Sequence, residues 1–273
     1  MRSPSRPPEP AAPLPADAVY LGEIEYGTAW RLQQLLVEQR ARGAGRDLLL
    51  LCQHPDVITV GRRQRAQANI LDPRFPVFEI ERGGDATYHG PGQLVGYPIL
   101  ALRPGRGAEQ GDPWGERDLH AYLRALEDAV GDLCKECGVA VGRRPGQTGV
   151  WTADAERKLA SLGIAVRRWV TFHGFALNVT TDLSRFATLN PCGLPAQVMT
   201  SLHAEAATLD GAAVSVRGLV AGALRHLSAH LRRDFQLRSA ADCGLDELIA
   251  AAAEPPAPSA ASSSTSAAEA CRL

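Results

Sequence analysis

The sequence predicts an α/β (α+β) fold, with a single domain in which helices flank a mixed β-sheet. Segments with a helical spacing of apolar residues alternate with short apolar runs that are typical of strands. The strand-like runs come in close pairs, as in hairpins, rather than each being followed by a helix. We therefore expect one sheet with both parallel and antiparallel neighbours.

The first helix is expected to begin at Thr28, whose hydroxyl can cap it, and to run to about Ala41 before Gly43. Trp30, Leu35 and Leu36 are expected to face the core. The run DLLLLCQ then reads as a buried strand, and VITVGRR follows as a second one.

The rest of the chain continues the same alternation. A second helix is expected over residues 117–137, where Gly138 ends it. Residues 148–180 have a strand-like pattern, and a third helix is expected over residues 215–232.

Both ends of the chain have compositions typical of disorder. Residues 1–18 are rich in proline, and residues 251–273 are mostly alanine, serine and proline. Neither stretch has enough apolar surface to offset the entropy of ordering. We predict two disordered tails around one ordered domain over residues 19–250, a length that suits a single compact domain.

The composition excludes several classes of protein. The formal net charge is −1, so the chain lacks the basic surplus with which proteins bind a nucleic-acid backbone. No apolar run approaches the roughly 18–20 residues that span a bilayer, and the proline-rich start does not resemble a secretory signal. We expect a cytoplasmic protein that binds neither nucleic acid nor membranes.

The six cysteines are expected to be reduced thiols, because no secretory signal accompanies them. Cys134 and Cys137 form one CxxC pair, but no second pair of cysteines or histidines has zinc-site spacing. Both lie in phase with the apolar side of the second predicted helix. They are therefore interpreted as core thiols, and no metal site is predicted.

The segment with the strongest chemical character runs from Arg82 to Pro98, with the sequence RGGDATYHGPGQLVGYP. Its glycines let the backbone approach a ligand and present N–H donors, beside the polar side chains of Thr87, Tyr88 and His89. A tight hairpin with incidental polar residues is the alternative. The segment matches no dinucleotide-binding or Walker A motif, and the chain has no G-x-S-x-G elbow.

Two further residues are candidates for catalysis. Cys192 lies in the segment NPCGLP, where proline and glycine hold the thiol on a constrained turn. Lys158 is one of only two lysines and opens the segment KLASLG. If the two side chains meet, the lysine favours the thiolate and can carry a proton. A buried structural cysteine and a solvated surface lysine are the alternatives.

The segment FHGFALNVT is expected to be a strand with His173, Phe175 and Leu177 on one face. A histidine on that apolar face is either a hydrogen-bonded core residue or a functional one. The sequence leaves both interpretations open.

Together these segments resemble the lipoyl(octanoyl) transferases, the octanoyl-acyl carrier protein:protein N-octanoyltransferases. The blocks HPDVITVGRR, RGGDATYHGPGQLVGYP, TGVW, KLASLG, FHGFALNV and NPCGL occur in that family's order and at its approximate spacing. The resemblance covers about Tyr20 to Arg233 and identifies residues 19–250 as the catalytic domain. It implies a fold like that of the biotin and lipoate protein ligases.

The resemblance also implies roles for individual residues. Cys192 would be the nucleophile that forms an acyl thioester, and Lys158 would lower the pKa of the Cys192 thiol and carry its proton. The implied substrate-binding residues are Arg82, Gly83, Gly84, Asp85, Ala86, Thr87, Tyr88, His89, Ser161, Leu162, Gly163, His173, Gly174 and Phe175.

The implied reaction moves an octanoyl group from octanoyl-acyl carrier protein to a lysine on a lipoyl domain, the first step of endogenous protein lipoylation. The implied acceptors are the lipoyl domains of 2-oxo acid dehydrogenases and the glycine cleavage H protein. Conversion of a thioester to an amide is downhill, so no ATP is needed. No cofactor is expected beyond the phosphopantetheine of the carrier protein.

Three positions depart from the family pattern. Asp85 stands where a longer polar side chain is common, Phe175 where leucine is usual, and Gln53 where glutamate is frequent. The larger Phe175 is expected to shorten or reshape the acyl tunnel. The alternatives are an ATP-dependent lipoate or biotin ligase of the same fold, a cysteine-dependent thioesterase, and a module that binds acyl carrier protein without turnover.

Overall fold

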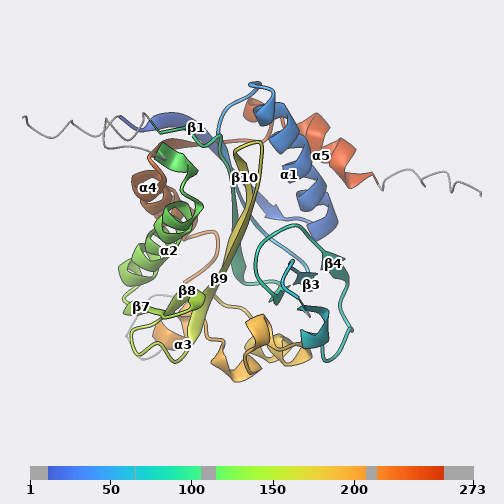
Figure 1. The fold of residues 1–273 in the computed structure, drawn as a ribbon, viewed down its shortest axis with the longest axis vertical. Coiled ribbons are helices and arrows are strands. Elements are labelled where there is room, and N and C mark those ends of the chain that lie inside the picture. The colour runs from blue at the N-terminus through green and yellow to red at the C-terminus, as the bar shows by residue number, and fades with distance from the viewer. Residues whose placement is uncertain (1–11, 65, 106–114, 207–213, 255–273) are drawn as a thin grey trace, which may run out of the picture.

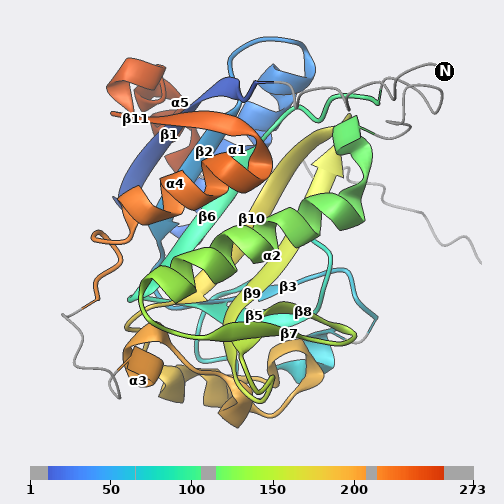
Figure 2. The ribbon, with the colours of Figure 1, turned by 90° about the vertical axis from the view of Figure 1, so that its left-hand side faces the viewer.

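The computed structural model describes residues 12–64, 66–105, 115–206 and 214–254. Within these ranges the chain forms an eight-stranded mixed sheet with helices on both faces, and a three-stranded sheet beside it (Figures 1 and 2). The fold class predicted from the sequence is confirmed.

The strands of the large sheet lie in the order β11-β1-β2-β6-β10-β9-β8-β7. β1 pairs in parallel with β2 and β11, and the other neighbours are antiparallel. These strands are β1 (Leu14–Glu23), β2 (Leu48–Gln53), β6 (Gln93–Ile99), β7 (Val141–Arg144), β8 (Gln147–Thr152), β9 (Lys158–Arg167), β10 (Val170–Asn178) and β11 (Arg233–Arg238). The small sheet has the order β4-β3-β5 and consists of β3 (Val57–Val60), β4 (Val77–Glu79) and β5 (Ala86–His89).

The helices cover the two faces of the large sheet in pairs. α2 and α4 lie on one face, and α1 and α5 lie on the other (Figure 2). The helices are α1 (Tyr26–Ala41), α2 (Leu119–Glu136), α3 (Leu202–Ala206), α4 (Val220–Leu231) and α5 (Asp246–Ala253).

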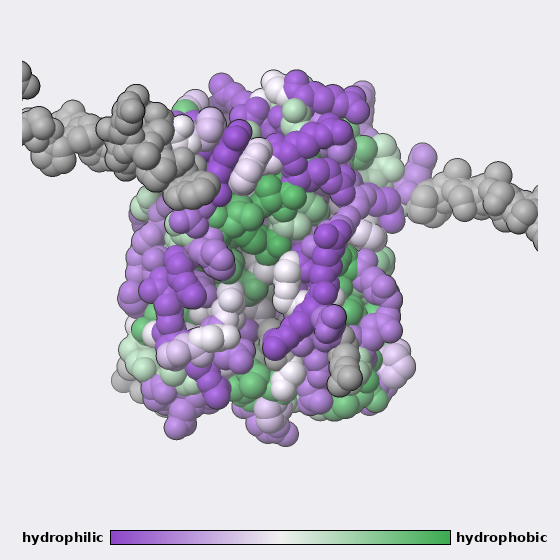
Figure 3. All heavy atoms as spheres, viewed as in Figure 1, coloured by the Kyte–Doolittle hydropathy of each residue, from purple (hydrophilic) through white to green (hydrophobic). Residues whose placement is uncertain are grey.

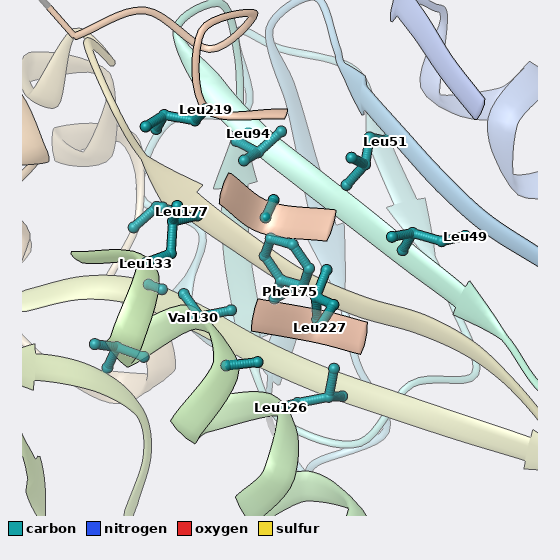
Figure 4. Packing of buried hydrophobic residues seen from close by; sticks show 14 of the residues in the cluster. Leu49, Leu51, Leu94, Leu126, Val130, Leu133, Phe175, Leu177, Leu219 and Leu227 are labelled. Atoms are coloured by element: carbon teal, nitrogen blue, oxygen red, sulfur yellow. The ribbon is translucent and has the colours of Figure 1, made fainter. Parts of the chain in front are cut away.

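The larger core lies between the sheet and the α2–α4 pair. Leu126 and Val130 of α2 and Leu227 of α4 pack with Phe175 and Leu177 of β10 (Figure 4). A second core lies between the opposite face of the sheet and the α1–α5 pair. Because apolar side chains hold the central strands from both sides, these strands form a rigid base for the loops at their ends.

Two details of α1 differ from the sequence prediction. The helix begins at Tyr26 rather than being capped by Thr28, and no side chain caps its first residue. Leu35 is 38% exposed, whereas Gln33 is fully buried. The buried face therefore includes a glutamine. This polar residue interrupts the apolar stripe, so the spacing of apolar residues does not show which face of the helix is buried.

The other two predicted helices are present with shifted starts. α2 begins at Leu119, after Asp118, whose carboxylate accepts the N–H of Ala121 at 3.0 Å. This is an N-cap that fixes the start of the helix. α4 begins at Val220, five residues later than predicted, and ends at Leu231; the next residue, Arg232, has the left-handed φ of 53° that is common after helix ends.

The ordered domain extends beyond the boundaries predicted from composition. β1 begins at Leu14, so residues 14–18 belong to the sheet and their predicted disorder is wrong. α5 likewise continues to Ala253. The remaining predictions of disorder, for residues 1–11 and 255–273, lie outside the described residues. In the described ranges no helix is both long and apolar enough to cross a membrane.

Candidate active site

A cavity opens where the Arg82–Gly84 loop meets the central strands. Its wall combines apolar side chains with a small number of polar ones, which is typical of a small-molecule site. The lining residues are Tyr26, Arg82, Gly84, Asp85, Thr87, His89, Val95, Tyr97, Ser161, Leu162, Gly163, His173, Gly174, Phe175 and Ala176.

The structure brings together the three segments in which the sequence placed substrate-binding residues. Of those residues, only Gly83, Ala86 and Tyr88 do not line the cavity. Ala86 and Tyr88 alternate with Thr87 and His89 along β5, and strand geometry turns their side chains into the opposite core. Gly83 donates its N–H to the Ile164 carbonyl at 3.0 Å, which ties the loop to β9.

Close backbone contacts explain the glycines around the cavity. A Cβ on Gly61 would lie 2.4 Å from the Gly84 carbonyl oxygen, and one on Gly163 would lie 2.8 Å from the Gly83 carbonyl oxygen. Gly84 itself has φ +95°, a conformation that side chains disfavour. The loop can therefore press against β3 and β9 only because these positions lack side chains.

The Arg82 side chain attaches the loop to Thr59 of β3. Its Nη2 donates to the carbonyl oxygen of Thr59 at 3.0 Å and to the Thr59 hydroxyl at 2.9 Å. The Thr59 hydroxyl also lies 3.3 Å from Nε2 of His89, and Nδ1 of His89 lies 2.8 Å from Oε1 of Gln93. Since the Gln93 oxygen can only accept, Nδ1 of His89 carries the proton and Nε2 accepts from Thr59.

His89 is uncharged at neutral pH. Burial, aided by the nearby His54, lowers the pKa of His89 to about 3. A neutral imidazole suits a largely apolar cavity wall, because an imidazolium there would be costly to desolvate.

His173 does not follow the face predicted for it. Its φ of +56° turns the residue out of the regular strand pattern, and its N–H donates to Oε1 of Gln33 on α1 at 2.8 Å. The imidazole lies beside the Phe172 ring, with Nε2 at 3.6 Å from Oε2 of Glu81. The His173 side chain therefore lies on the face of the sheet that α1 covers, whereas Phe175 lies on the face that α2 and α4 cover.

Two polar atoms of the cavity wall are buried without a hydrogen-bond partner among the described residues. They are Oγ of Ser161 and Nε2 of His173. Burial also lowers the pKa of His173, so its ring is neutral near pH 7. Because buried polar groups are nearly always paired, Oγ of Ser161 is available to a bound ligand, whereas Nε2 of His173 faces the Glu81 carboxylate.

Phe175 contributes to the cavity from the core side. Its ring packs against Gly96, where a Cβ would lie only 2.2 Å from a ring carbon, and points among the leucines under α4 (Figure 4). The effect of this larger side chain on the length of an acyl tunnel stays a prediction.

The turn that carries Cys192 borders the cavity. Cys192 lies in the 3-10 turn η5 (Pro191–Gly193). The N–H of Asn190, which precedes the turn, donates to the carbonyl oxygen of Asn69 at 2.8 Å. Nδ2 of Asn69 donates to Oδ1 of Asp85 at 2.6 Å, and a Cβ on Gly193 would lie 3.9 Å from Oδ2 of Asp85. Asp85, a lining residue, therefore connects the turn to the cavity.

Lys158 lies at the start of β9, three residues before Ser161. Its side chain is only 2% exposed, and its carbonyl oxygen accepts the N–H of Thr200 at 3.0 Å. The surface-lysine interpretation is therefore wrong. Lys158 does not line the cavity itself, and its contact with Cys192 stays a prediction.

The other cysteines of the described ranges are poor nucleophiles. Burial raises the pKa of the thiols of Cys52 and Cys134, and to a smaller extent those of Cys137 and Cys243. Cys134 is a core residue, as predicted, whereas Cys137 is only partly buried. Within the same ranges no group of three or more His, Cys, Asp or Glu side chains could hold a metal ion.

Sequence reasoning missed four lining residues. They are Tyr26 on α1 and Val95, Tyr97 and Ala176 on the central strands. Their residue types are those of ordinary core positions, so no local signal distinguishes them. Only the packing of α1 and β6 around the cavity gives them a role.

Comparison with known proteins identifies the family. A family model described as the lipoyl protein ligase A/B catalytic domain matches residues 25–218. An octanoyltransferase of Geobacter metallireducens is 50% identical over 184 residues, which cover 67% of this chain and 80% of that protein. One of Syntrophotalea carbinolica is 45% identical over 212 residues, which cover 78% and 92%.

Solved structures share the fold at lower identity. A lipoate-protein ligase A bound with ATP has a TM-score of 0.65 and 16% identity, over 83% of this chain and 89% of that chain. A bi-partite lipoate protein ligase from Thermoplasma acidophilum has a TM-score of 0.60 and 20% identity, over 83% and 87%. The family model and the octanoyltransferase relatives point to the same family. The chain belongs to the lipoyl protein ligase A/B catalytic domain family and, within it, to the octanoyltransferases, which are acyltransferase enzymes.

Proposed function

We propose that this enzyme transfers an octanoyl group from octanoyl-acyl carrier protein to a lysine of a lipoyl domain, through a thioester on Cys192. The observation that carries the proposal is the position of the η5 turn, which Asp85 links to the cavity wall. An acyl chain in the cavity would lie against Val95, Leu162 and Phe175. Its thioester carbon would then face the turn that holds the nucleophile.

The first step is a thioester exchange. The Cys192 thiolate attacks the carbonyl carbon of the donor thioester, and the bond from that carbon to the carrier's sulfur breaks. The departing thiolate takes up the proton that Lys158 received from Cys192. The products are an acyl-enzyme and the free thiol of the carrier protein.

The second step forms the amide. The uncharged amine of the acceptor lysine attacks the acyl-enzyme carbonyl, and the bond to Sγ of Cys192 breaks. Lys158 moves the proton released by the amine to the cysteine sulfur, which restores the free enzyme. No ATP or other cofactor enters either step, because the thioester itself supplies the free energy.

The acceptor is proposed to be a lipoyl domain of a 2-oxo acid dehydrogenase or the glycine cleavage H protein. A solved structure of the same fold supports this choice, since it describes a lipoate protein ligase together with its E2 lipoyl domain.

A transfer assay with purified octanoyl-acyl carrier protein and a lipoyl domain, in the absence of ATP, tests the proposal. The wild type should form octanoyl-lysine on the acceptor, and Cys192→Ala should lower the rate by at least about a thousandfold, because it removes the nucleophile. Cys243→Ala, which changes a cysteine outside the site, is the matched control and should keep the wild-type rate.

Other outcomes would replace the proposal. Full transfer by Cys192→Ala would exclude the covalent route. Octanoyl-lysine that forms only with ATP and free octanoate would indicate a ligase, and release of free octanoate without amide would indicate a thioesterase.

A further inference from the structure

The block TGVW forms one side of the space that holds the Lys158 side chain. Trp151 of β8 and Lys158 of β9 are directly paired across the two strands. Nζ of Lys158 lies 5.4 Å from the centroid of the Trp151 ring. The indole is fully buried, and its Nε1 donates to the Gln147 carbonyl oxygen at 3.3 Å. The ring therefore has a fixed orientation beside the ammonium.

Cation–π attraction is strong at this place because water is largely excluded. A cation within about 6 Å of a tryptophan ring is attracted to its electron-rich face, and the attraction is stronger when the pair is desolvated. The guanidinium of Arg144 lies 5.0 Å from the same ring. The indole thus offers its electron-rich surface to two cations, one of them a candidate catalytic group.

Gly149 provides the room for the lysine stem. A Cβ at this position would lie 2.4 Å from Cε of Lys158 and 2.7 Å from the carbonyl oxygen of Ala160. Its φ of +143° is also one that other residues rarely adopt. The lysine chain therefore passes directly over the backbone of β8.

Helix α2 fixes Gly149 in turn. Oε1 of Glu127 accepts the Gly149 N–H at 2.9 Å, and the carboxylate is only 2% exposed. Its other oxygen accepts from Nε of Arg143 at 3.2 Å and from Arg124. A buried, fully engaged carboxylate of this kind holds its partner backbone in one position.

We propose that Trp151 is a positioning residue for Lys158: the indole face, backed by Gly149 and Glu127, holds the ammonium where it can serve the Cys192 thiol. This inference rests on the proposed roles of Lys158 and Cys192. It gives the TGVW block a function that its residue types do not reveal.

The test compares Trp151→Leu and Trp151→Phe with the wild type. Leucine removes the π surface, so kcat for octanoyl transfer should fall about tenfold, with KM for the donor within twofold. Phenylalanine keeps a weaker π surface and should recover part of the loss. The rate of Cys192 alkylation, assigned to its peptide by mass spectrometry, should rise at higher pH in Trp151→Leu than in the wild type.

Trp169→Leu is the matched control. Trp169 lies in the turn after β9, at the end far from Lys158, and Arg117 lies 4.8 Å from its ring. The same chemistry is thus removed away from the site. This variant should keep the wild-type kcat and alkylation profile.

A double-mutant cycle separates this inference from the proposed function. If Trp151 acts through Lys158, then Trp151→Leu adds no further shift of the alkylation profile in a Lys158→Ala background. A wild-type profile in Trp151→Leu, or an additive shift in the double variant, would overturn the positioning role. If Lys158→Ala alone matched the wild type in both assays, the proposed role of Lys158 would fall, and the role of Trp151 with it.

Discussion

The charge states of His54 and His89 affect the stability of the site. Burial lowers the pKa of His54 to about 4 and that of His89 to about 3. His54 is held between the Ile24 carbonyl oxygen and the Tyr97 hydroxyl, each at 2.7 Å. Both rings are neutral in the folded enzyme at pH 7, so folding stabilises the uncharged forms.

Stability is therefore predicted to fall in mild acid. The unfolded chain binds these protons below about pH 6.5, while the folded enzyme resists them down to about pH 4, so the unfolding free energy decreases as the pH falls through this window. Each histidine should lower the unfolding free energy by about 2 kcal/mol between pH 7 and 5. Urea unfolding at pH 7 and pH 5 measures this difference, and His54→Asn should reduce it. An equal pH dependence in wild type and variant would contradict the prediction.

Among the elements, α2 determines the geometry of the β8–β9 pair through one side chain. Glu127 reaches from the helix to the Gly149 N–H. Arg143 and Arg124, its two cationic partners, are roughly half exposed. The buried hydrogen bond to Gly149 should therefore contribute more to the unfolding free energy than the ion pairs do, because water can replace the partners of exposed guanidinium groups.

Glu127→Ala is predicted to lower the unfolding free energy by about 2–3 kcal/mol, because it leaves the Gly149 N–H buried without an acceptor. Glu127→Gln keeps an acceptor oxygen and should lose clearly less. Urea unfolding of both variants checks this ranking. Equal losses would show that the ion pairs, rather than the hydrogen bond to Gly149, stabilise the element pair.

For the whole molecule, a buried charge network joins the edge strand β11 to the rest of the sheet. Arg233 is 1% exposed and donates through Nη1 and Nη2 to the two carboxylate oxygens of Glu116, at 2.9 Å each. Its Nε donates to Asp47 at 2.5 Å, and Asp47 also accepts the N–H of Ala101 at 3.0 Å. The interaction with Arg233 helps to lower the pKa of Glu116 to about 2, against the effect of burial.

Arg233→Ala is predicted to destabilise the fold by about 3 kcal/mol, since the buried Asp47 and the partly buried Glu116 then keep only the more exposed Arg40 and Arg103 as partners. Arg238→Ala, on the same strand but half exposed, should change the unfolding free energy by less than about 0.5 kcal/mol. Thermal and urea unfolding compare the two variants. A similar small effect in both would mean that the network does not stabilise the sheet.

Local patterns were sufficient to predict the mixed sheet and the flanking helices, whereas the residues predicted to bind substrate came from the family resemblance. The apolar runs of β2 and β10 and the stripe of α2 follow ordinary strand and helix periods, which the sequence displays directly. The glycine-rich loop could be recognised from its composition, because backbone contacts as close as that of Gly61 with Gly84 require glycine.

The features that the sequence did not predict depend on contacts between segments that are far apart in the chain. The left-handed conformation of His173 is supported by Gln33, which lies 140 residues earlier on another element. The place of Trp151 beside Lys158 follows from the pairing of β8 with β9. Neither relation has a signature in local periodicity, since tertiary packing decides which side chains meet.

Intact-mass spectrometry after mixing the enzyme with octanoyl-acyl carrier protein, without ATP, is the most direct test of covalent transfer through Cys192. We expect one octanoyl adduct per chain, localised to the peptide that contains Cys192, and no adduct on the Cys192→Ala variant. An enzyme that stays unmodified, yet forms octanoyl-lysine when ATP and free octanoate are supplied, would contradict the covalent transfer.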